Sequence, residues 1–141
     1  MHRRSTWKIS TNFYVGILIS GGTSDGVEQN DLELFVPSKG NSRSCSLMSL
    51  PSSRSRHTLD IIKNNPVICG GGTTPKSCIR FTNGNWSDYY NPLIYGRNEP
   101  TSWVSRNGLV LMGGWHSPAT TEILPGDDVS REEFNLKYTA M

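Results

Sequence analysis

The chain has 141 residues, a formal net charge of +2 at pH 7 and 18% charged residues. This length is typical of one domain, and the arginines are scattered instead of forming a basic stripe with stacking aromatics, which argues against nucleic-acid binding. No apolar run approaches the roughly 18 residues of a membrane-spanning helix, so no membrane span is expected either.

Residues 1–12 are predicted to form an N-terminal tail. The apolar segment that follows, residues 13–19, comes after a basic start and therefore has the outline of a secretory signal. It is short, however, and Gly16 interrupts it. We interpret it as a β-strand and expect no export signal in this sequence.

Paired glycines end three short β-prone runs along the chain. The pairs begin 49 and 43 residues apart, a spacing typical of repeated sheet units such as β-propeller blades. Almost nothing between them indicates a helix, because Gly, Pro, Ser and Asn interrupt the apolar runs every few residues. The three pairs are Gly21 and Gly22, Gly70 and Gly71, and Gly113 and Gly114.

Each glycine pair is expected to lie inside a four-stranded antiparallel meander. In the middle unit, a polar turn leads from the strand at residues 77–82 into a strand that contains Trp86. In the last unit, the segment Ser102–Gly113 turns at Asn107-Gly108, which is a strong hairpin signal. The final strand of that unit is predicted from the alternating residues Phe134, Leu136 and Tyr138.

Two further residue types recur at the start of the later units. Thr58 and Thr101 each lie twelve residues before a glycine pair. Arg56 and Arg97 precede these threonines and are interpreted as the matching arginines of the repeat. The repeat therefore extends well beyond the glycines.

This set of residues resembles the kelch-repeat family. The resemblance rests on the glycine pair after an apolar strand, the later aromatic Trp86, and the arginine and threonine that open a repeat. The segment Thr101–Gly114, followed by Thr120–Glu122, is also similar to kelch proteins related to the central domain of galactose oxidase. The resemblance implies an all-β fold, an incomplete β-propeller of about three four-stranded antiparallel kelch-type blades. The expected blades cover residues 13–53, 54–95 and 96–141.

The chain departs from the family pattern in some residues and in the number of units. Phe35 and Phe81 stand where the family has tyrosine, and Cys45 stands in the first unit where the family has tryptophan. Propellers have about four to eight blades, and an arc of three leaves two apolar faces open. Two explanations stay open: the chain is a fragment of a larger propeller, or it self-associates to complete the ring.

No catalytic, cofactor-binding or metal site is predicted. The glycine pairs lack the lysine and the following helix of a phosphate-binding loop. A copper site, which a galactose-oxidase-like ancestor would imply, is not expected because no second histidine is well placed beside His116. None of the three histidines has a second His or Cys at ligand spacing; they are His2, His57 and His116.

The resemblance implies a non-catalytic protein-interaction module whose partner the sequence does not identify. Loops at one end of a propeller form its recognition face, and the expected loops are residues 23–30, 73–76 and 115–119, together with those that join one blade to the next. Trp115 is predicted to contact a partner, since an exposed tryptophan is a common interface anchor. Packing of Trp115 under the neighbouring blade is the alternative.

The cysteines leave the compartment open. Cys69 and Cys78 can face one another across a hairpin, and a disulfide there would indicate an extracellular compartment. The alternative is a pair of reduced, buried cysteines in a cytoplasmic protein. Cys45 is left over in either case, and three alternatives stay open for its partner: a cysteine of another chain, a cysteine in a missing part of a larger protein, or none. Asn85 begins an Asn-Trp-Ser sequon, a glycosylation site if the chain is exported. These features favour the alternative function, a secreted carbohydrate-binding or galactose-oxidase-like propeller domain.

Overall fold

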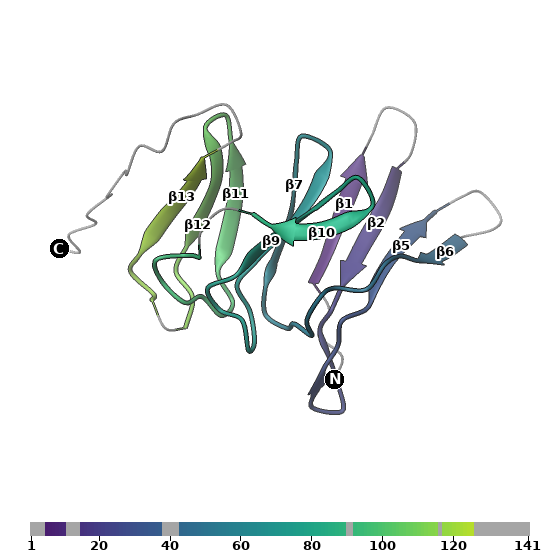
Figure 1. Ribbon diagram of the computed structural model, residues 1–141, viewed down its shortest axis with the longest axis horizontal. Coiled ribbons are helices and arrows are strands. Elements are labelled where there is room, and N and C mark those ends of the chain that lie inside the picture. Colours follow the sequence, from purple (N-terminus) through teal and green to yellow (C-terminus); the bar gives the residue numbers. More distant parts are fainter. Residues whose placement is uncertain (1–4, 11–14, 38–42, 90–91, 116, 126–141) are drawn as a thin grey trace.

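The computed structural model describes residues 5–10, 15–37, 43–89, 92–115 and 117–125. Every regular element in these ranges is a β-strand, which confirms the all-β prediction, and no helix there is long and apolar enough to cross a membrane. The strands (Figure 1) are β1 (Ser5–Ser10), β2 (Val15–Ser20), β3 (Thr23–Ser24), β4 (Val27–Glu28), β5 (Leu32–Val36), β6 (Arg43–Ser46), β7 (Thr58–Ile62), β8 (Asn65–Cys69), β9 (Cys78–Thr82), β10 (Asn85–Asp88), β11 (Thr101–Ser105), β12 (Gly108–Met112) and β13 (Thr121–Pro125).

The strands form three antiparallel sheets and one small hairpin. The first sheet has the order β1-β2-β5-β6, the second β7-β8-β9-β10 and the third β11-β12-β13, while β3 and β4 pair with each other. Figure 1 shows the second sheet between the first and the third. The order of the second sheet is the predicted four-stranded meander. The final strand predicted for the last unit, with Phe134, Leu136 and Tyr138, falls outside the described residues.

The first sheet begins earlier in the chain than predicted. The prediction of a tail over residues 1–12 is wrong, because Ser5–Ser10 form β1 and pair with β2 along their whole length. The reason is visible in the alternation of polar and apolar residues from Thr6 to Ile9, which is the strand pattern. The first sheet therefore has four strands.

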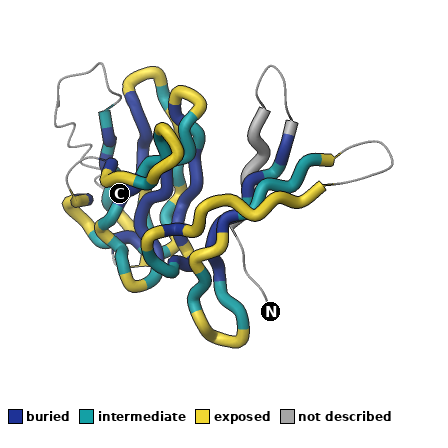
Figure 2. The backbone as a smooth tube through the Cα atoms, turned by 45° about the vertical axis from the view of Figure 1, so that its right-hand side comes forward, coloured by how far each residue is buried: buried dark blue, intermediate teal, exposed yellow. Residues whose placement is uncertain are grey.

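The hydrophobic core consists of two layers, one on each side of the second sheet. Successive residues of β8, Val67 and Ile68, are both fully buried and belong to different layers. A strand is apolar on both faces when both faces are covered. Figure 2 shows buried segments along the central strands and exposed segments at the turns. The first layer contains Leu18, Leu32, Leu50, Leu59, Ile68 and Ile79; the second contains Ile62, Val67, Cys69, Cys78, Tyr89, Leu93, Leu109, Leu111 and Leu124.

Cys69 and Cys78 form a disulfide. The sequence left two alternatives open, a disulfide or two reduced cysteines, and the structure has the first. Cys69 and Cys78 are directly opposite each other on β8 and β9, and the S–S bond lies within the second core layer. Cys45 is a free cysteine on β6 and is exposed. The disulfide fixes the register of two central strands.

The burial of this disulfide predicts how the cysteines react. A thiol reagent should label only Cys45 in the native protein, because Cys69 and Cys78 are 0% and 3% exposed. Denaturation without a reductant should still expose one thiol, and denaturation with a reductant should expose all three. Three reactive thiols in denatured, unreduced protein would show that the disulfide does not form.

Candidate interaction surface

The antiparallel strands give the molecule two distinct ends. The glycine pairs follow β2, β8 and β12, so the loops 21–31, 70–77 and 113–120 lie together at what we call the diglycine end. The turns between β7 and β8, β9 and β10, and β11 and β12 lie at the opposite end, which we call the hairpin end. The three loops predicted to form a recognition face are therefore all at the diglycine end.

The three glycine pairs have the same backbone conformation. The first glycine of each pair has φ of 50°, 70° and 64°, and the second has φ of 102°, 87° and 107°, in chain order. The N–H of the first glycine donates to the carbonyl of the residue just before β5, β9 or β13, at 2.8, 2.8 and 2.9 Å. These hydrogen bonds are Gly21 to Asp31, Gly70 to Ser77 and Gly113 to Thr120.

The second glycine of a pair connects its sheet to the next one. The N–H of Gly22 donates to the carbonyl of Arg54, and the N–H of Gly71 donates to the carbonyl of Arg97, both at 2.8 Å. A Cβ on Gly70 would lie 2.5 Å from the Arg97 carbonyl oxygen, so the two backbones touch at this corner. Glycine is required here because no side chain fits between the sheets.

The segments that join one sheet to the next are also equivalent. Each runs back beside the start of β5 or β9 and the loop before that strand, and makes the same series of backbone hydrogen bonds, at 2.8 to 2.9 Å. After the first sheet the N–H groups of Leu47, Leu50 and Arg54 donate to the carbonyls of Leu32, Asn30 and Gln29; after the second, those of Tyr89, Leu93 and Arg97 donate to Cys78, Lys76 and Pro75. The chain therefore repeats one unit of structure, including its connections.

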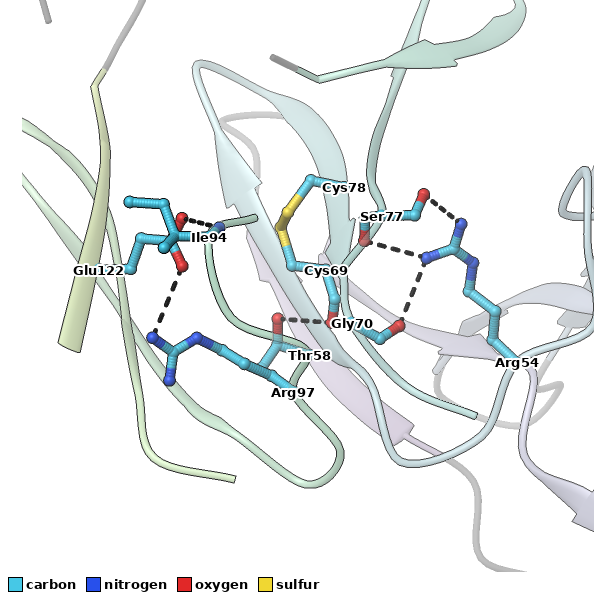
Figure 3. Close-up of a disulfide and its surroundings, with 9 residues drawn as sticks. All are labelled: Arg54, Thr58, Cys69, Gly70, Ser77, Cys78, Ile94, Arg97 and Glu122. Atoms are coloured by element: carbon cyan, nitrogen blue, oxygen red, sulfur yellow. Dashed lines mark hydrogen bonds and ion pairs between the residues drawn. A yellow bond between two sulfur atoms is a disulfide. The ribbon is translucent and has the colours of Figure 1, made fainter. Parts of the chain in front are cut away.

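Two buried arginines, Arg54 and Arg97, occupy corresponding positions in these connections. They are 2% and 0% exposed. The Arg54 guanidinium donates to the carbonyls of Gly70 and Ser77 at 3.3 and 3.2 Å, and also to the Ser77 hydroxyl at 2.8 Å (Figure 3). Each arginine thereby fixes the diglycine loop of the sheet that follows it.

Arg97 repeats this arrangement in the third sheet and adds an ion pair. Its guanidinium donates to the carbonyls of Gly113 and Thr120 at 2.6 and 3.1 Å, and it lies 3.5 Å from the Glu122 carboxylate. Glu122 also accepts the N–H of Ile94 at 2.8 Å. Burial lowers the pKa of Arg97, and the Glu122 carboxylate opposes that shift.

The interpretation of Arg56 as the counterpart of Arg97 is wrong, because Arg54 makes the equivalent contacts. Arg56 is exposed, and its side chain lies 3.5 Å from the Glu99 carboxylate. Arg56 and Glu99 share the same unusual φ of 57°, which makes them the matching pair. A signal for the correct assignment exists in the sequence: a leucine precedes each buried arginine by four residues, and a threonine follows it by four.

Trp86 lies on β10, the outermost strand of the second sheet. Its ring packs against Phe81 with a centroid distance of 5.2 Å and covers the first core layer. The register pairs Phe81 with Trp86 and Phe35 with Ser44, so Ser44 and not Cys45 takes the tryptophan position in the first sheet. Ser44 therefore offers no aromatic ring at this position.

His57 lies buried between the first and second sheets. Its Nε2 is 2.7 Å from the hydroxyl of Ser20. Burial, with a smaller contribution from the charge of Arg54, lowers the pKa of His57 to about 4. The histidine is therefore neutral in the folded protein at neutral pH and serves as a polar contact between sheets.

This lowered pKa predicts acid sensitivity. Because the pKa of His57 falls from 6.5 when unfolded to about 4 when folded, its contribution to stability is complete above pH 6.5 and is lost as the pH falls to about 4. Within this window unfolding should take up about one proton at this site. Burial raises the pKa of Asp60, which acts in the opposite direction. Denaturant titrations across pH, compared with His57→Gln, isolate the histidine, and an unchanged slope in the variant would contradict the assignment.

Each loop region of the diglycine end, or the connection beside it, carries exposed large apolar side chains. Trp115 is 73% exposed, which excludes the alternative that it packs under a neighbouring sheet. The backbone N–H of Trp115 donates to the carbonyl of Asn98, so the loop that carries Trp115 is fixed to the connection before the third sheet. We call this set of residues the loop-end patch; it comprises Val27, Ile94, Tyr95 and Trp115.

A second exposed surface is the face of the third sheet that points away from the second. Cross-strand pairing places Trp103, Val110 and Ile123 on this face, with Met112 beside them. Trp103 and Met112 are 64% and 38% exposed, whereas Val110 is 9% exposed. In the second sheet Val67, which corresponds to Val110, is fully buried in the second core layer. We call this surface of the third sheet the outer face, defined by Trp103, Val110, Met112 and Ile123.

Asn85, the predicted glycosylation site, is exposed at the start of β10. His2 and His116 fall outside the described residues. In the part of the chain that the structure describes, no group of three or more His, Cys, Asp or Glu side chains is arranged to hold a metal ion.

Comparison with known proteins shows a likeness in fold. No protein-family model matches the chain, and no curated protein matches it in sequence. Among solved structures the chain is similar to one described as the structure of YjhT, with a TM-score of 0.64 and 13% identity over 83% of this chain. The match spans 40% of the YjhT chain. At 13% identity this likeness shows a similar fold and nothing about function.

Proposed function

We propose that this chain is an arc of kelch-type β-propeller blades that acts as a non-catalytic protein-interaction module. The observation that carries the proposal is the equivalence of the units: the same glycine corners, the same buried arginine and the same connection recur from sheet to sheet. Such a scaffold holds its loops rigidly at one end. The loop-end patch then serves as the recognition surface.

Trp115 supports this assignment of the recognition surface. A large aromatic side chain on a rigid loop loses little conformational freedom on binding, and such residues dominate binding energy at protein interfaces. Tyr95 adds a second exposed aromatic from the connection before the third sheet, where its ring lies 5.9 Å from the Arg97 guanidinium carbon. Both aromatics thus sit on backbone that a buried arginine fixes.

A selection from displayed random peptides tests this surface. We expect the wild-type chain to enrich peptides whose binding falls at least tenfold with Trp115→Ala, the loss expected for an anchor worth more than about 1.4 kcal/mol. Trp103→Ala is the matched control, because it removes an exposed tryptophan from the outer face instead. Peptides that bind the Trp115→Ala protein as well as the wild type would contradict the proposal.

The outer face supports self-association to complete the ring. Its exposed side chains Trp103 and Met112 correspond to Asp60 and Cys69 of the second sheet, which are buried, and exposed apolar surface of this kind drives association. The first sheet carries Ile17 and Ile19 on the face that points away from the second sheet. A head-to-tail contact between two copies would thus repeat the internal sheet-to-sheet contact.

Sedimentation velocity over a range of concentrations tests this association. The wild type should form a dimer, Trp103→Glu should shift it to the monomer, and Trp115→Glu should leave it dimeric. A wild type that stays monomeric at the highest concentration would contradict self-association while leaving the peptide test of the loop-end patch valid.

A second candidate function is carbohydrate binding in a secreted protein. The Cys69–Cys78 disulfide favours it, because disulfides persist in extracellular compartments. Exposed aromatic rings such as Trp115 can also stack on sugar rings. Tryptophan fluorescence during titration with simple sugars, compared between the wild type and Trp115→Ala, separates the two functions: a saturable change that the variant lacks indicates a sugar site.

A further inference from the structure

The sequon at Asn85 lies in an accessible part of the second sheet. Asn85-Trp86-Ser87 is the only Asn-X-Ser/Thr triplet of the sequence. Asn85 and Ser87 are both exposed, and the turn residues Asn83 and Gly84 before them are exposed as well. An oligosaccharide on Asn85 therefore meets no neighbouring side chain of the core.

The strand geometry separates the modifiable residues from the packing residue. Side chains alternate along a strand, so Asn85 and Ser87 share one side of β10 and Trp86 takes the other. There Trp86 packs on Phe81 and the first core layer. The middle residue of the sequon thus anchors the strand while the residues that the transfer reaction uses remain accessible.

The position of β10 also suits a modification. It is the outermost strand of the second sheet, and among the described strands it pairs with β9 alone, so its other edge is a sheet edge. Such edges invite pairing with other chains, and natural proteins cover them. Asn85 opens β10 at the hairpin end, away from the loop-end patch. A glycan there shields a sheet edge without covering the recognition surface.

We propose that Asn85 is N-glycosylated and that the chain matures where the Cys69–Cys78 disulfide forms. The disulfide is an independent observation for the same oxidising compartment. In the transfer, the Asn85 Nδ2 attacks the anomeric carbon of a lipid-diphosphate-linked oligosaccharide. The N-glycosidic bond forms, the bond from that carbon to the diphosphate oxygen breaks, the lipid diphosphate leaves with the electron pair, and one Nδ2 proton is released. This inference goes beyond the proposed binding function and does not depend on it.

The test expresses the full chain behind a cleavable secretion leader in eukaryotic cells. Mass spectrometry of all recovered chain, secreted and retained, should show one N-glycan on most molecules. Enzymatic removal of the glycan should convert Asn85 to aspartate. The glycan should be absent from Asn85→Gln and Ser87→Ala and present in Ser87→Thr, which keeps the sequon.

Asn107→Gln is the matched control. It alters an exposed asparagine in the β11–β12 turn that lies outside any sequon, and it should keep the glycan. Unmodified Asn85 in wild-type chain that has formed the Cys69–Cys78 disulfide overturns the proposal, as does a glycan that persists in both Asn85→Gln and Ser87→Ala. Because occupancy is measured on retained chain too, a variant that fails to fold still gives an answer.

Discussion

Arg97→Ala should destabilise the protein by about 3–5 kcal/mol, the cost of removing one partner of a buried ion pair. The substitution leaves the Glu122 carboxylate buried without its positive charge, and it removes the donor to the Gly113 and Thr120 carbonyls. It also leaves a cavity where a fully buried side chain stood. Chemical denaturation followed by fluorescence measures the free energy of unfolding.

Arg56→Ala is the matched control for this prediction. Arg56 is exposed and pairs with Glu99 on the surface, where an ion pair is worth about 0–1 kcal/mol. The prediction therefore distinguishes the two arginines that the sequence places near Thr58 and Thr101. Equal effects of Arg56→Ala and Arg97→Ala would contradict the assignment of Arg54 and Arg97 as the structural arginines.

Gly70→Ala should be the second most damaging of these substitutions. Its positive φ of 70° costs an L-residue about 1–2 kcal/mol. The added Cβ would also lie 2.5 Å from the carbonyl oxygen of Arg97, so the second and third sheets must move apart. Overpacking of this kind costs about a further 1–3 kcal/mol. The same denaturation experiment measures the sum.

Gly84→Ala separates these two contributions. Gly84 has a φ of 81° in the β9–β10 turn, yet a Cβ there has no heavy atom within 4 Å. It should therefore show the cost of the backbone conformation alone. If Gly70→Ala destabilises the protein no more than Gly84→Ala, the close approach of neighbouring units at the glycine corner is disproved.

The glycine pairs made the repeat predictable from the sequence. A glycine pair after a β-prone run is a local pattern, and its spacing places the three corners without any knowledge of the tertiary structure. The Cys69–Cys78 pairing was predictable as one of two alternatives for a similar reason, because both cysteines flank the same loop. Local patterns with a clear period were thus sufficient for the strand order of the second sheet.

The buried arginine of the second sheet was not predictable from proximity to a threonine. Arg54 and Arg56 are two residues apart, and only long-range contacts with Gly70 and Ser77 decide which one is buried. Strand β1 was not predicted because the alternation from Thr6 to Ile9 covers only four residues, and so short a pattern identifies a strand only together with its partner β2.

Which face of the third sheet is exposed was also not predictable from the sequence. Trp103 and Val104 are adjacent apolar residues on opposite faces of β11, and nothing in their order tells which face lacks a neighbouring sheet. Trp103 is 64% exposed and Val104 is 39% exposed, so the exposure of these two residues does not identify that face either. The face is identified by Leu109 and Leu111 of β12, which belong to the second core layer.

Amide hydrogen exchange at two glycines tests the central claim most directly, namely that successive units are equivalent and dock through their glycine corners. The N–H groups of Gly22 and Gly71 donate to the carbonyls of Arg54 and Arg97 in neighbouring units, so both should be strongly protected in the native protein. Gly26 and Gly84, which lie in exposed turns, provide the unprotected reference. Exchange of Gly22 or Gly71 as fast as that of Gly26 and Gly84 would contradict the account.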